Sequence, residues 1–159
     1  MVKPASYLQL SIRKILKKFI NRFNNFLSLQ LPIDNMLKRI LIADDDPGIV
    51  DAVEMILNFH GYEVSSTYNG NEVLTIQDNY PDVLLLDIWM SGCDGRDVCR
   101  ELKANDTTRH IPILMISASK DIKESALQAG ANDFLAKPFD MKELLSKIED
   151  LLANQLLSA

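Results

Sequence analysis

The feature that most constrains this chain is the apolar run Val83-Leu84-Leu85-Leu86, which ends in the carboxylate Asp87. Pro81 stands before the run, and two glycines follow it within eight residues. A short apolar run between such breakers is typical of a strand that is buried on both faces, as in parallel sheets covered by helices. We therefore expect Asp87 at the carboxyl end of a central strand, which is the edge where open α/β sheets bind ligands.

Strand and helix patterns alternate along the chain after residue 38. Strands are expected at 40–43, 62–66, 83–87, 113–117 and 134–136, and helices at 47–60, 71–79, 97–104, 122–129 and from 140 onward. The second strand is the most polar and is expected at an edge of the sheet. This alternation implies βαβ units with right-handed crossovers, and hence an α/β fold with a doubly wound, five-stranded parallel sheet.

The first 38 residues differ in charge from the rest of the chain. They hold seven basic side chains against Asp34 alone, whereas residues 39–159 hold 10 basic and 21 acidic ones. Apolar residues from Leu8 to Leu27 recur at helical spacing, which predicts a basic amphipathic helix that would lie on an anionic membrane surface or on the acidic body. Alternatively, residues 1–35 are not translated, because Met36 is a natural start. The chain is thus divided into a basic extension, 1–38, and one domain, 39–159.

Composition and cysteine spacing favour a cytoplasmic globular protein. The chain is 47% hydrophobic and 25% charged, which is ordinary for such proteins, and it has no apolar run of the length that spans a membrane. Cys93 and Cys99 lack the spacing of a metal or redox motif, and no secretion signal precedes them. We therefore expect both thiols to stay reduced.

Polar side chains follow four of the five expected strands. Asp44, Asp45 and Asp46 follow the first strand, Asp87 ends the third, Ser117 ends the fourth, and Lys137-Pro138 follows the fifth. The carboxyl ends of parallel strands meet at one edge, so these groups are expected together. Crowded carboxylates repel one another unless a cation intervenes, and Mg²⁺ is the cation best suited to all-oxygen ligands. A lysine and a hydroxyl beside it would complete a cradle for a phosphoryl group.

This order of motifs resembles the receiver domain of two-component response regulators, over residues 39–155. The resemblance implies a flavodoxin-like fold with strand order 2-1-3-4-5, an order carried over from the chemotaxis member of the family. It also implies that Asp87 is the phosphate acceptor. Asp44 and Asp45 would then hold Mg²⁺ as metal ligands, together with Asp87 and the backbone carbonyl of Trp89.

The remaining motif residues also correspond to family positions. By this resemblance, Ser117 is the hydroxyl and Lys137 the lysine that contact the phosphoryl group. Ser117 and Phe134 are the switch pair, and Lys137-Pro138 is the peptide held in the cis form. The sequence departs from the family pattern at Ser91, where proline is usual, at Trp89, which is bulky for its position, and at Ser117, where threonine is more common.

The resemblance implies a single-domain response regulator of a phosphorelay, comparable to the chemotaxis regulator. A sensor histidine kinase or phosphotransfer protein would donate to Asp87, and output would pass through altered contacts with a downstream protein. No nucleic-acid contact is expected, because no output domain follows the last helix, and the only catalysis expected is the protein's own phosphoryl transfer and dephosphorylation. Alternatives are a Mg²⁺-dependent phosphatase of the haloacid dehalogenase type, which would need an aspartate where Trp89 stands, and a receiver-like scaffold that never turns over phosphate.

Overall fold

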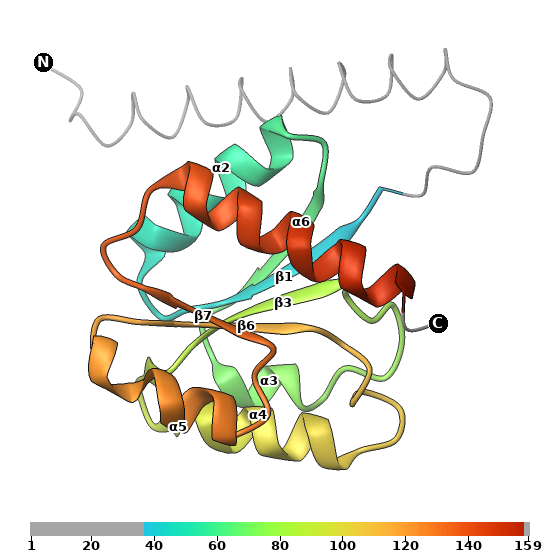
Figure 1. Ribbon diagram of the computed structural model, residues 1–159, viewed down its shortest axis with the longest axis vertical. Coiled ribbons are helices and arrows are strands. Elements are labelled where there is room, and N and C mark those ends of the chain that lie inside the picture. The colour runs from blue at the N-terminus through green and yellow to red at the C-terminus, as the bar shows by residue number, and fades with distance from the viewer. Residues whose placement is uncertain (1–36, 158–159) are drawn as a thin grey trace, which may run out of the picture.

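Five parallel strands form the centre of the computed structural model, which describes residues 37–157 (Figure 1). They are β1 (Arg39–Ala43), β2 (Glu63–Thr67), β3 (Val83–Asp87), β6 (Ile113–Ser117) and β7 (Asp133–Ala136). Their order in the sheet is β2-β1-β3-β6-β7, and every neighbouring pair is parallel. The doubly wound, five-stranded parallel sheet predicted from the sequence is therefore confirmed, and so is the strand order 2-1-3-4-5 that the family resemblance implies. Nearly all of the basic extension, Met36 included, lies outside the described residues, so its helix and its boundary stay predictions.

The burial of each strand follows its place in the sheet. All five residues of β3 and all five of β6 are buried, because both strands lie inside the sheet and between two helical layers. Only Thr67 is buried in β2, whose sequence Glu-Val-Ser-Ser-Thr is mostly polar. The prediction that the second strand lies at an edge is confirmed. Charged and polar side chains on such an edge also discourage pairing with another chain.

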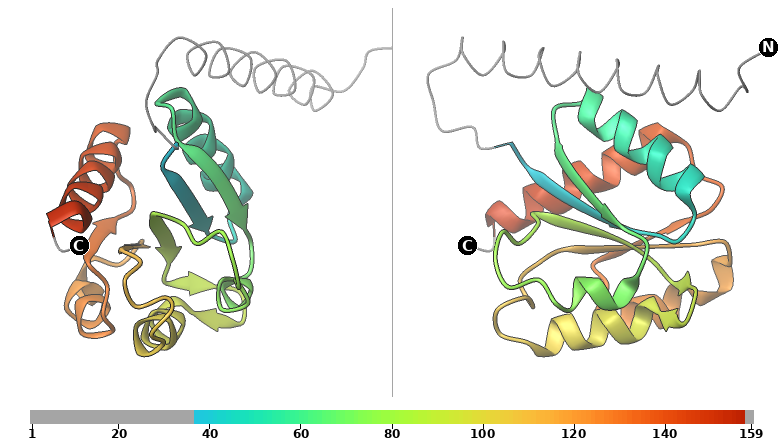
Figure 2. Two further views of the ribbon diagram at one scale, coloured as in Figure 1. Left: turned by 90° about the vertical axis from the view of Figure 1, so that its right-hand side faces the viewer. Right: turned by 180° about the vertical axis from the view of Figure 1, so that it is seen from behind.

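Helices cover both faces of the sheet (Figures 1 and 2). On one face lie α2 (Pro47–Phe59) and α6 (Met141–Leu157), and on the other lie α3 (Gly70–Val73), α4 (Gly95–Ala104) and α5 (Lys123–Gln128), the last preceded by the 3₁₀ turn η1 (Lys120–Ile122). Successive strand residues point to opposite faces, so Leu84 and Leu86 join one core while Val83 and Leu85 join the other. The chain thus builds two apolar cores around one sheet.

Aspartates begin three of the helices. The side chain of Asp46 accepts hydrogen bonds from the backbone of Gly48 and Ile49 at the start of α2, and Pro47 follows at the first helical position. Asp94 caps α4 through the backbone N–H of Arg96, and Asp140 accepts the backbone N–H of Glu143 at 2.8 Å. Each carboxylate satisfies a helix N–H that has no partner within the helix. Two of these caps, Asp46 and Asp140, lie at the starts of helices that the sequence predicts.

The helix predicted at 71–79 is the main error in the expected elements, because α3 ends at Val73. Beyond it, the Thr75 hydroxyl donates to the carbonyl of Glu72, and Asn79 adopts a positive φ of 52° that no α-helix accommodates. Polar residues that bond their own backbone favour turns over helix interiors. One helical turn therefore covers this part of the sheet where two and a half were expected.

A second feature absent from the prediction is a short hairpin after β3. Its strands are β4 (Trp89–Met90) and β5 (Cys93–Asp94), and its turn contains Gly92 with a φ of +76°. The backbone then passes so close to the end of β3 that a Cβ on Gly95 would lie 2.2 Å from the carbonyl oxygen of Asp87. Glycine is therefore required at position 95 to bring α4 against the end of β3.

The remaining expectations about the chain concern cysteines and membrane spans. Cys93 and Cys99 are free, and burial raises the pKa of the Cys99 thiol to about 11, which disfavours the reactive thiolate. Within residues 37–157, no helix is long and apolar enough to cross a membrane.

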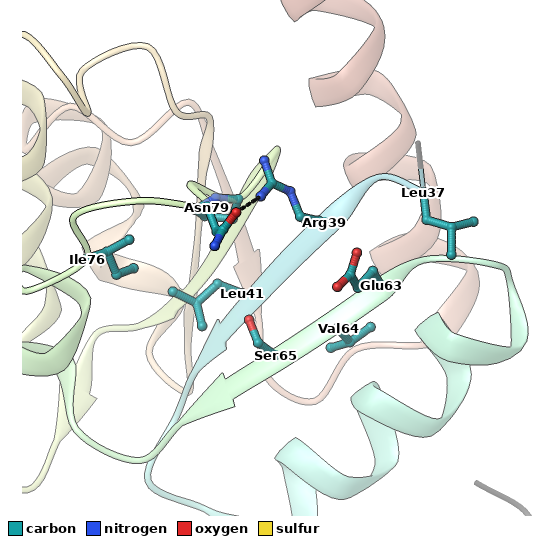
Figure 3. Close-up of a pocket in the computed structure, with 9 residues that line it drawn as sticks. Leu37, Arg39, Leu41, Glu63, Val64, Ser65, Ile76 and Asn79 are labelled. Carbon is teal, nitrogen blue, oxygen red and sulfur yellow. Dashed lines mark hydrogen bonds between the residues drawn. The ribbon is translucent and has the colours of Figure 1, made fainter. Parts of the chain in front are cut away.

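A groove lies along β1 and the edge strand β2, on the side that the short α3 leaves open (Figure 3). Leu41, Val64 and Ile76 provide apolar lining, and Arg39 reaches across to donate a hydrogen bond to the Asn79 side chain. Its lining includes none of the carboxylates predicted to hold a metal or to accept phosphate.

Candidate functional site

Two buried carboxylates stand side by side at the carboxyl edge of the sheet. Asp87 ends β3, and Asp44 directly follows β1, the neighbouring strand. Asp44 is 2% exposed and Asp87 is 5% exposed. Such burial is costly for charged groups unless partners compensate it, so this edge of the sheet is the candidate functional site.

Lys137 provides the positive charge that offsets the burial of the two carboxylates. It follows β7, and its Nζ donates to Asp44 Oδ2 and to Asp87 Oδ1, each at 2.7 Å. Because β7 lies at the far edge of the sheet, this side chain reaches back across β6 to join the two carboxylates. The peptide bond between Lys137 and Pro138 is cis, as predicted.

The pKa values of these groups reflect opposed effects. Burial raises the pKa of the Asp87 carboxyl, and the nearby Asp44 charge adds to it, so the two together outweigh the hydrogen bonds from Lys137 and from the backbone of Trp89. Burial by itself lowers the pKa of Lys137, but the two carboxylates outweigh it and hold that pKa above its usual range. At neutral pH the lysine is therefore charged, and the site holds more negative than positive charge.

Asp45 is the third carboxylate of the cluster and the most exposed. It lies in the loop after β1, where its Oδ2 accepts two hydrogen bonds from Ser91, one from the backbone N–H at 2.8 Å and one from the hydroxyl at 2.9 Å. These two bonds hold the pKa of Asp45 below its ordinary value. One carboxylate oxygen from each of Asp44, Asp45 and Asp87 lies within 4.8 Å of the others.

This donor set fits a magnesium ion. Mg²⁺ takes hard oxygen ligands, usually one or two carboxylates with waters and phosphate oxygens, and it would offset the excess negative charge. Asp44, Asp45 and Asp87 are the residues that would hold it. The backbone N–H of Trp89 donates to Asp87 Oδ2 at 2.9 Å, so this residue is already fixed beside the cluster.

The predicted switch residues lie on adjoining strands, inside the protein. Ser117 is fully buried at the end of β6, and its Oγ accepts the backbone N–H of Ser119 at 3.2 Å. Phe134 on β7 is paired with Met115 and is 6% exposed. Within the described residues the Ser117 hydroxyl is not hydrogen-bonded to Asp87, and the switch roles of Ser117 and Phe134 stay predictions.

Trp89 lies at the surface beside the acidic cluster, with 54% of the residue exposed. The guanidinium carbon of Arg96 lies 4.9 Å from the centre of its ring, a cation–π contact. Arg96 is itself held by Asp94 and by the hydroxyl of Ser125. The indole is therefore fixed by a charged side chain that the sequence pattern did not indicate.

Comparison with known proteins identifies the family. The model of the response regulator receiver domain matches residues 40–149, which is well over half of the chain. The chain belongs to this family. Solved structures that resemble this chain are also response regulators or receiver domains. A putative response regulator from Chloroflexus aurantiacus is 37% identical, with a TM-score of 0.70 over 74% of this chain and 98% of that one.

A second solved receiver domain bears on the metal. It belongs to the sensor histidine kinase PA1611 of Pseudomonas aeruginosa and carries a magnesium ion coordinated in its active-site cleft. It is 31% identical, with a TM-score of 0.68 over 74% of this chain and 98% of that one. Receiver domains bind Mg²⁺ at an acidic site of the kind that Asp44, Asp45 and Asp87 form here.

The curated relatives are longer proteins. Similarity extends to the DNA-binding dual master transcriptional regulator RpaA of Synechocystis, 38% identical over 120 residues, and to the response regulator MprA of Mycobacterium bovis, 40% identical over 120 residues. These stretches cover 73% and 74% of this chain but 49% and 51% of the two relatives. The chain therefore spans about half the length of these relatives, and DNA binding is a property of RpaA.

Proposed function

We propose that the protein is a phosphorylation-dependent switch in which Asp87 accepts a phosphoryl group from the phosphohistidine of a sensor kinase or phosphotransfer protein. The observation that carries the proposal is the Lys137 bridge between Asp44 and Asp87, with Asp45 beside them.

The chemistry follows from these groups. A carboxylate oxygen of Asp87 attacks the phosphorus, the bond from phosphorus to the histidine nitrogen breaks, and the imidazole leaves with the bonding electron pair. Bound Mg²⁺, held by Asp44, Asp45 and Asp87, would supply positive charge for the oxygens of the phosphoryl group. Lys137 keeps its proton because its pKa is raised, so its ammonium can pair with the new phosphoryl group.

Output would follow from rearrangement of Ser117 and Phe134. The Ser117 hydroxyl now accepts from the Ser119 backbone, and it can also donate to a phosphoryl oxygen on Asp87. Strand β6 joins this hydroxyl to Met115, the residue paired with Phe134. A shift at Ser117 would therefore reach a buried aromatic ring on the next strand, and the surface over it would change its contacts with a downstream protein.

The test is phosphorylation by acetyl phosphate with Mg²⁺, read by intact mass. The wild-type protein should gain about 80 Da of acid-labile mass, the increment of one phosphoryl group. Asp87→Asn should gain none, whereas the matched control Asp106→Asn, an exposed aspartate in the 105–111 loop, should gain as much as wild type. Labelling of Asp87→Asn, or loss of labelling in Asp106→Asn, would refute the assignment of Asp87.

The phosphatase alternative predicts a different outcome. An aspartate-nucleophile phosphatase would hydrolyse p-nitrophenyl phosphate through many turnovers, because a second acidic side chain speeds hydrolysis of the aspartyl phosphate. Trp89 occupies the position of that second acid. We therefore expect at most one phosphoryl group transferred per protein chain on the time scale of labelling.

A further inference from the structure

Ser91 makes a contact that joins two loops far apart in the sequence. Its backbone N–H and its hydroxyl both donate to the same oxygen of Asp45, at 2.8 and 2.9 Å, across 46 residues of chain. Ser91 is the first turn residue of the β4–β5 hairpin, and Gly92, with a positive φ, is the second. The hairpin therefore carries the serine to the loop that follows β1.

This contact depends on the residue type at position 91. Proline, the usual family residue there, has no backbone N–H and no hydroxyl, so it could make neither bond. Alanine would keep the backbone bond and lose the other. The paired hydrogen bonds are thus a consequence of the particular residue in this chain.

Asp45 is the carboxylate in the cluster that most needs an external restraint. Asp44 and Asp87 are buried, and Lys137 fixes both. Asp45 is only partly buried and belongs to the loop, and its Oδ2 is held by Ser91. A cation that binds a loose carboxylate must also restrict its rotation, which lowers affinity, whereas a carboxylate already oriented by hydrogen bonds avoids that cost.

We propose that Ser91 is a positioning residue for the cation site: its hydroxyl orients Asp45 toward Asp44 and Asp87 and strengthens Mg²⁺ binding. The inference rests on the proposed function for the identity of the cation. It adds that the affinity of the site is set partly by a hairpin residue that touches neither the metal nor the phosphoryl group. Ser91 acts only through Asp45.

The test measures the dissociation constant for Mg²⁺ alone, without any phosphodonor, by calorimetry on the full-length protein. Ser91→Ala should weaken binding by about tenfold, a typical effect for a residue that orients a metal ligand. Ser91→Pro, which loses both bonds, should weaken it at least as much. Ser91→Thr keeps the hydroxyl and should bind Mg²⁺ as tightly as wild type.

Ser65→Ala is the matched control, because Ser65 is an exposed serine on β2 and is not hydrogen-bonded to any carboxylate of the cluster in the described residues. It should bind Mg²⁺ as tightly as wild type. A Ser91→Ala variant with unchanged affinity would overturn the inference. Tighter binding would overturn it as well, because it would mean that the hydroxyl competes with the cation for Asp45.

The measurement separates this inference from the proposed function. If wild-type protein takes up phosphate at Asp87 and binds Mg²⁺, but Ser91→Ala binds it equally well, only the role of Ser91 fails. If wild-type protein binds no Mg²⁺ at millimolar concentration and takes up no phosphate, the proposed function fails first.

Discussion

The acidic site has a buried half and an exposed half, and the two are built differently. Asp44, Asp87 and Lys137 come from or directly follow three strands of the sheet, and the two carboxylates are almost inaccessible to water. Asp45 and Ser91 lie in loops, and their contacts are within reach of solvent. The sheet fixes the first set, whereas individual residue choices fix the second.

The carboxyl groups of the two halves also differ in their pKa values. Burial raises the pKa of Asp87, whereas hydrogen bonds from Ser91 lower that of Asp45. The charged form of the carboxyl group is thus disfavoured at Asp87 and favoured at Asp45, although one oxygen of each lies within 4.8 Å of the other. The proposed phosphoryl acceptor thus lies in the buried half, whereas the proposed adjustment of cation affinity by Ser91 lies in the exposed half.

Removal of Lys137 should have the largest effect on stability. Lys137→Ala leaves two buried carboxylates without their shared partner. Breaking a buried ion pair lowers the free energy of unfolding by about 3–5 kcal/mol. This range is an upper limit here, because the carboxyls can take up protons instead. Urea unfolding in EDTA at neutral pH measures the loss. The loss should shrink as the pH falls and the carboxyls are protonated. If Lys137→Ala lowers the free energy of unfolding by less than the loss of an exposed ion pair does, buried ion pairs do not stabilise this half of the site.

Neutralising the two kinds of aspartate should change stability in opposite directions. The folded-state pKa of Asp87 lies above its unfolded value, so its charge opposes folding at neutral pH, and Asp87→Asn should raise the melting temperature of metal-free protein by about 2–4 °C. The folded-state pKa of Asp45 lies below its unfolded value, so its contribution is present at neutral pH and is lost as the pH falls through that lowered pKa. Asp45→Asn should therefore lower the melting temperature slightly.

Calorimetric scans in EDTA give both values. Asp140→Asn is the control, because asparagine caps a helix as well as aspartate does and the melting temperature should not move. If Asp87→Asn and Asp45→Asn shift the melting temperature in the same direction, burial does not make the charges of the two aspartates affect stability differently.

Trp89 should affect the lifetime of the phosphorylated protein. Its backbone is bonded to Asp87 and its ring is held by Arg96, so we expect the indole to crowd the path by which water reaches the phosphorus. Trp89→Asn should then shorten the lifetime by about threefold to tenfold, because the position of a reactant changes the barrier. Single-turnover decay in Mg²⁺ at one pH measures it. Equal or slower decay in the variant would show that the ring lies clear of that path.

The smallest effect is expected at an ion pair remote from the site. Lys38 bonds Asp82 at 2.9 Å, and the two side chains are 44% and 22% exposed. Exposed pairs contribute about 0–1 kcal/mol. Lys38→Ala should therefore change urea unfolding by less than about 1 kcal/mol, and a change as large as that of Lys137→Ala would remove the contrast between buried and exposed charges.

The buried half of the site was predictable from the sequence. The apolar run of β3 and its terminal Asp87 indicate a central strand, and parallel strands bring Asp44, Ser117 and Lys137 to the same edge. Strand order came from the family resemblance, since periodicity alone does not give it. The structure places all four residues at that edge, although their roles stay predictions.

The exposed half could not be predicted in the same way. The β4–β5 hairpin has only two residues in each strand, too few for a periodic pattern, and the Ser91 to Asp45 contact depends on how two loops meet in space. The Trp89 to Arg96 contact is similar. The sequence signal that was available is the Ser91-Gly92 pair, because a glycine after a serine favours a tight turn, and Gly92 does adopt a positive φ.

The short helix α3 has a consequence for local unfolding. It supplies a single turn over the edge of the sheet, and β2, the edge strand beside it, buries only Thr67. Segments with few buried apolar contacts open at a lower free energy than the whole domain. Amide hydrogens of β2 should therefore exchange with deuterium well before those of β3 and β6, so this edge of the domain would open while the strands that carry Asp87 and Ser117 stay closed.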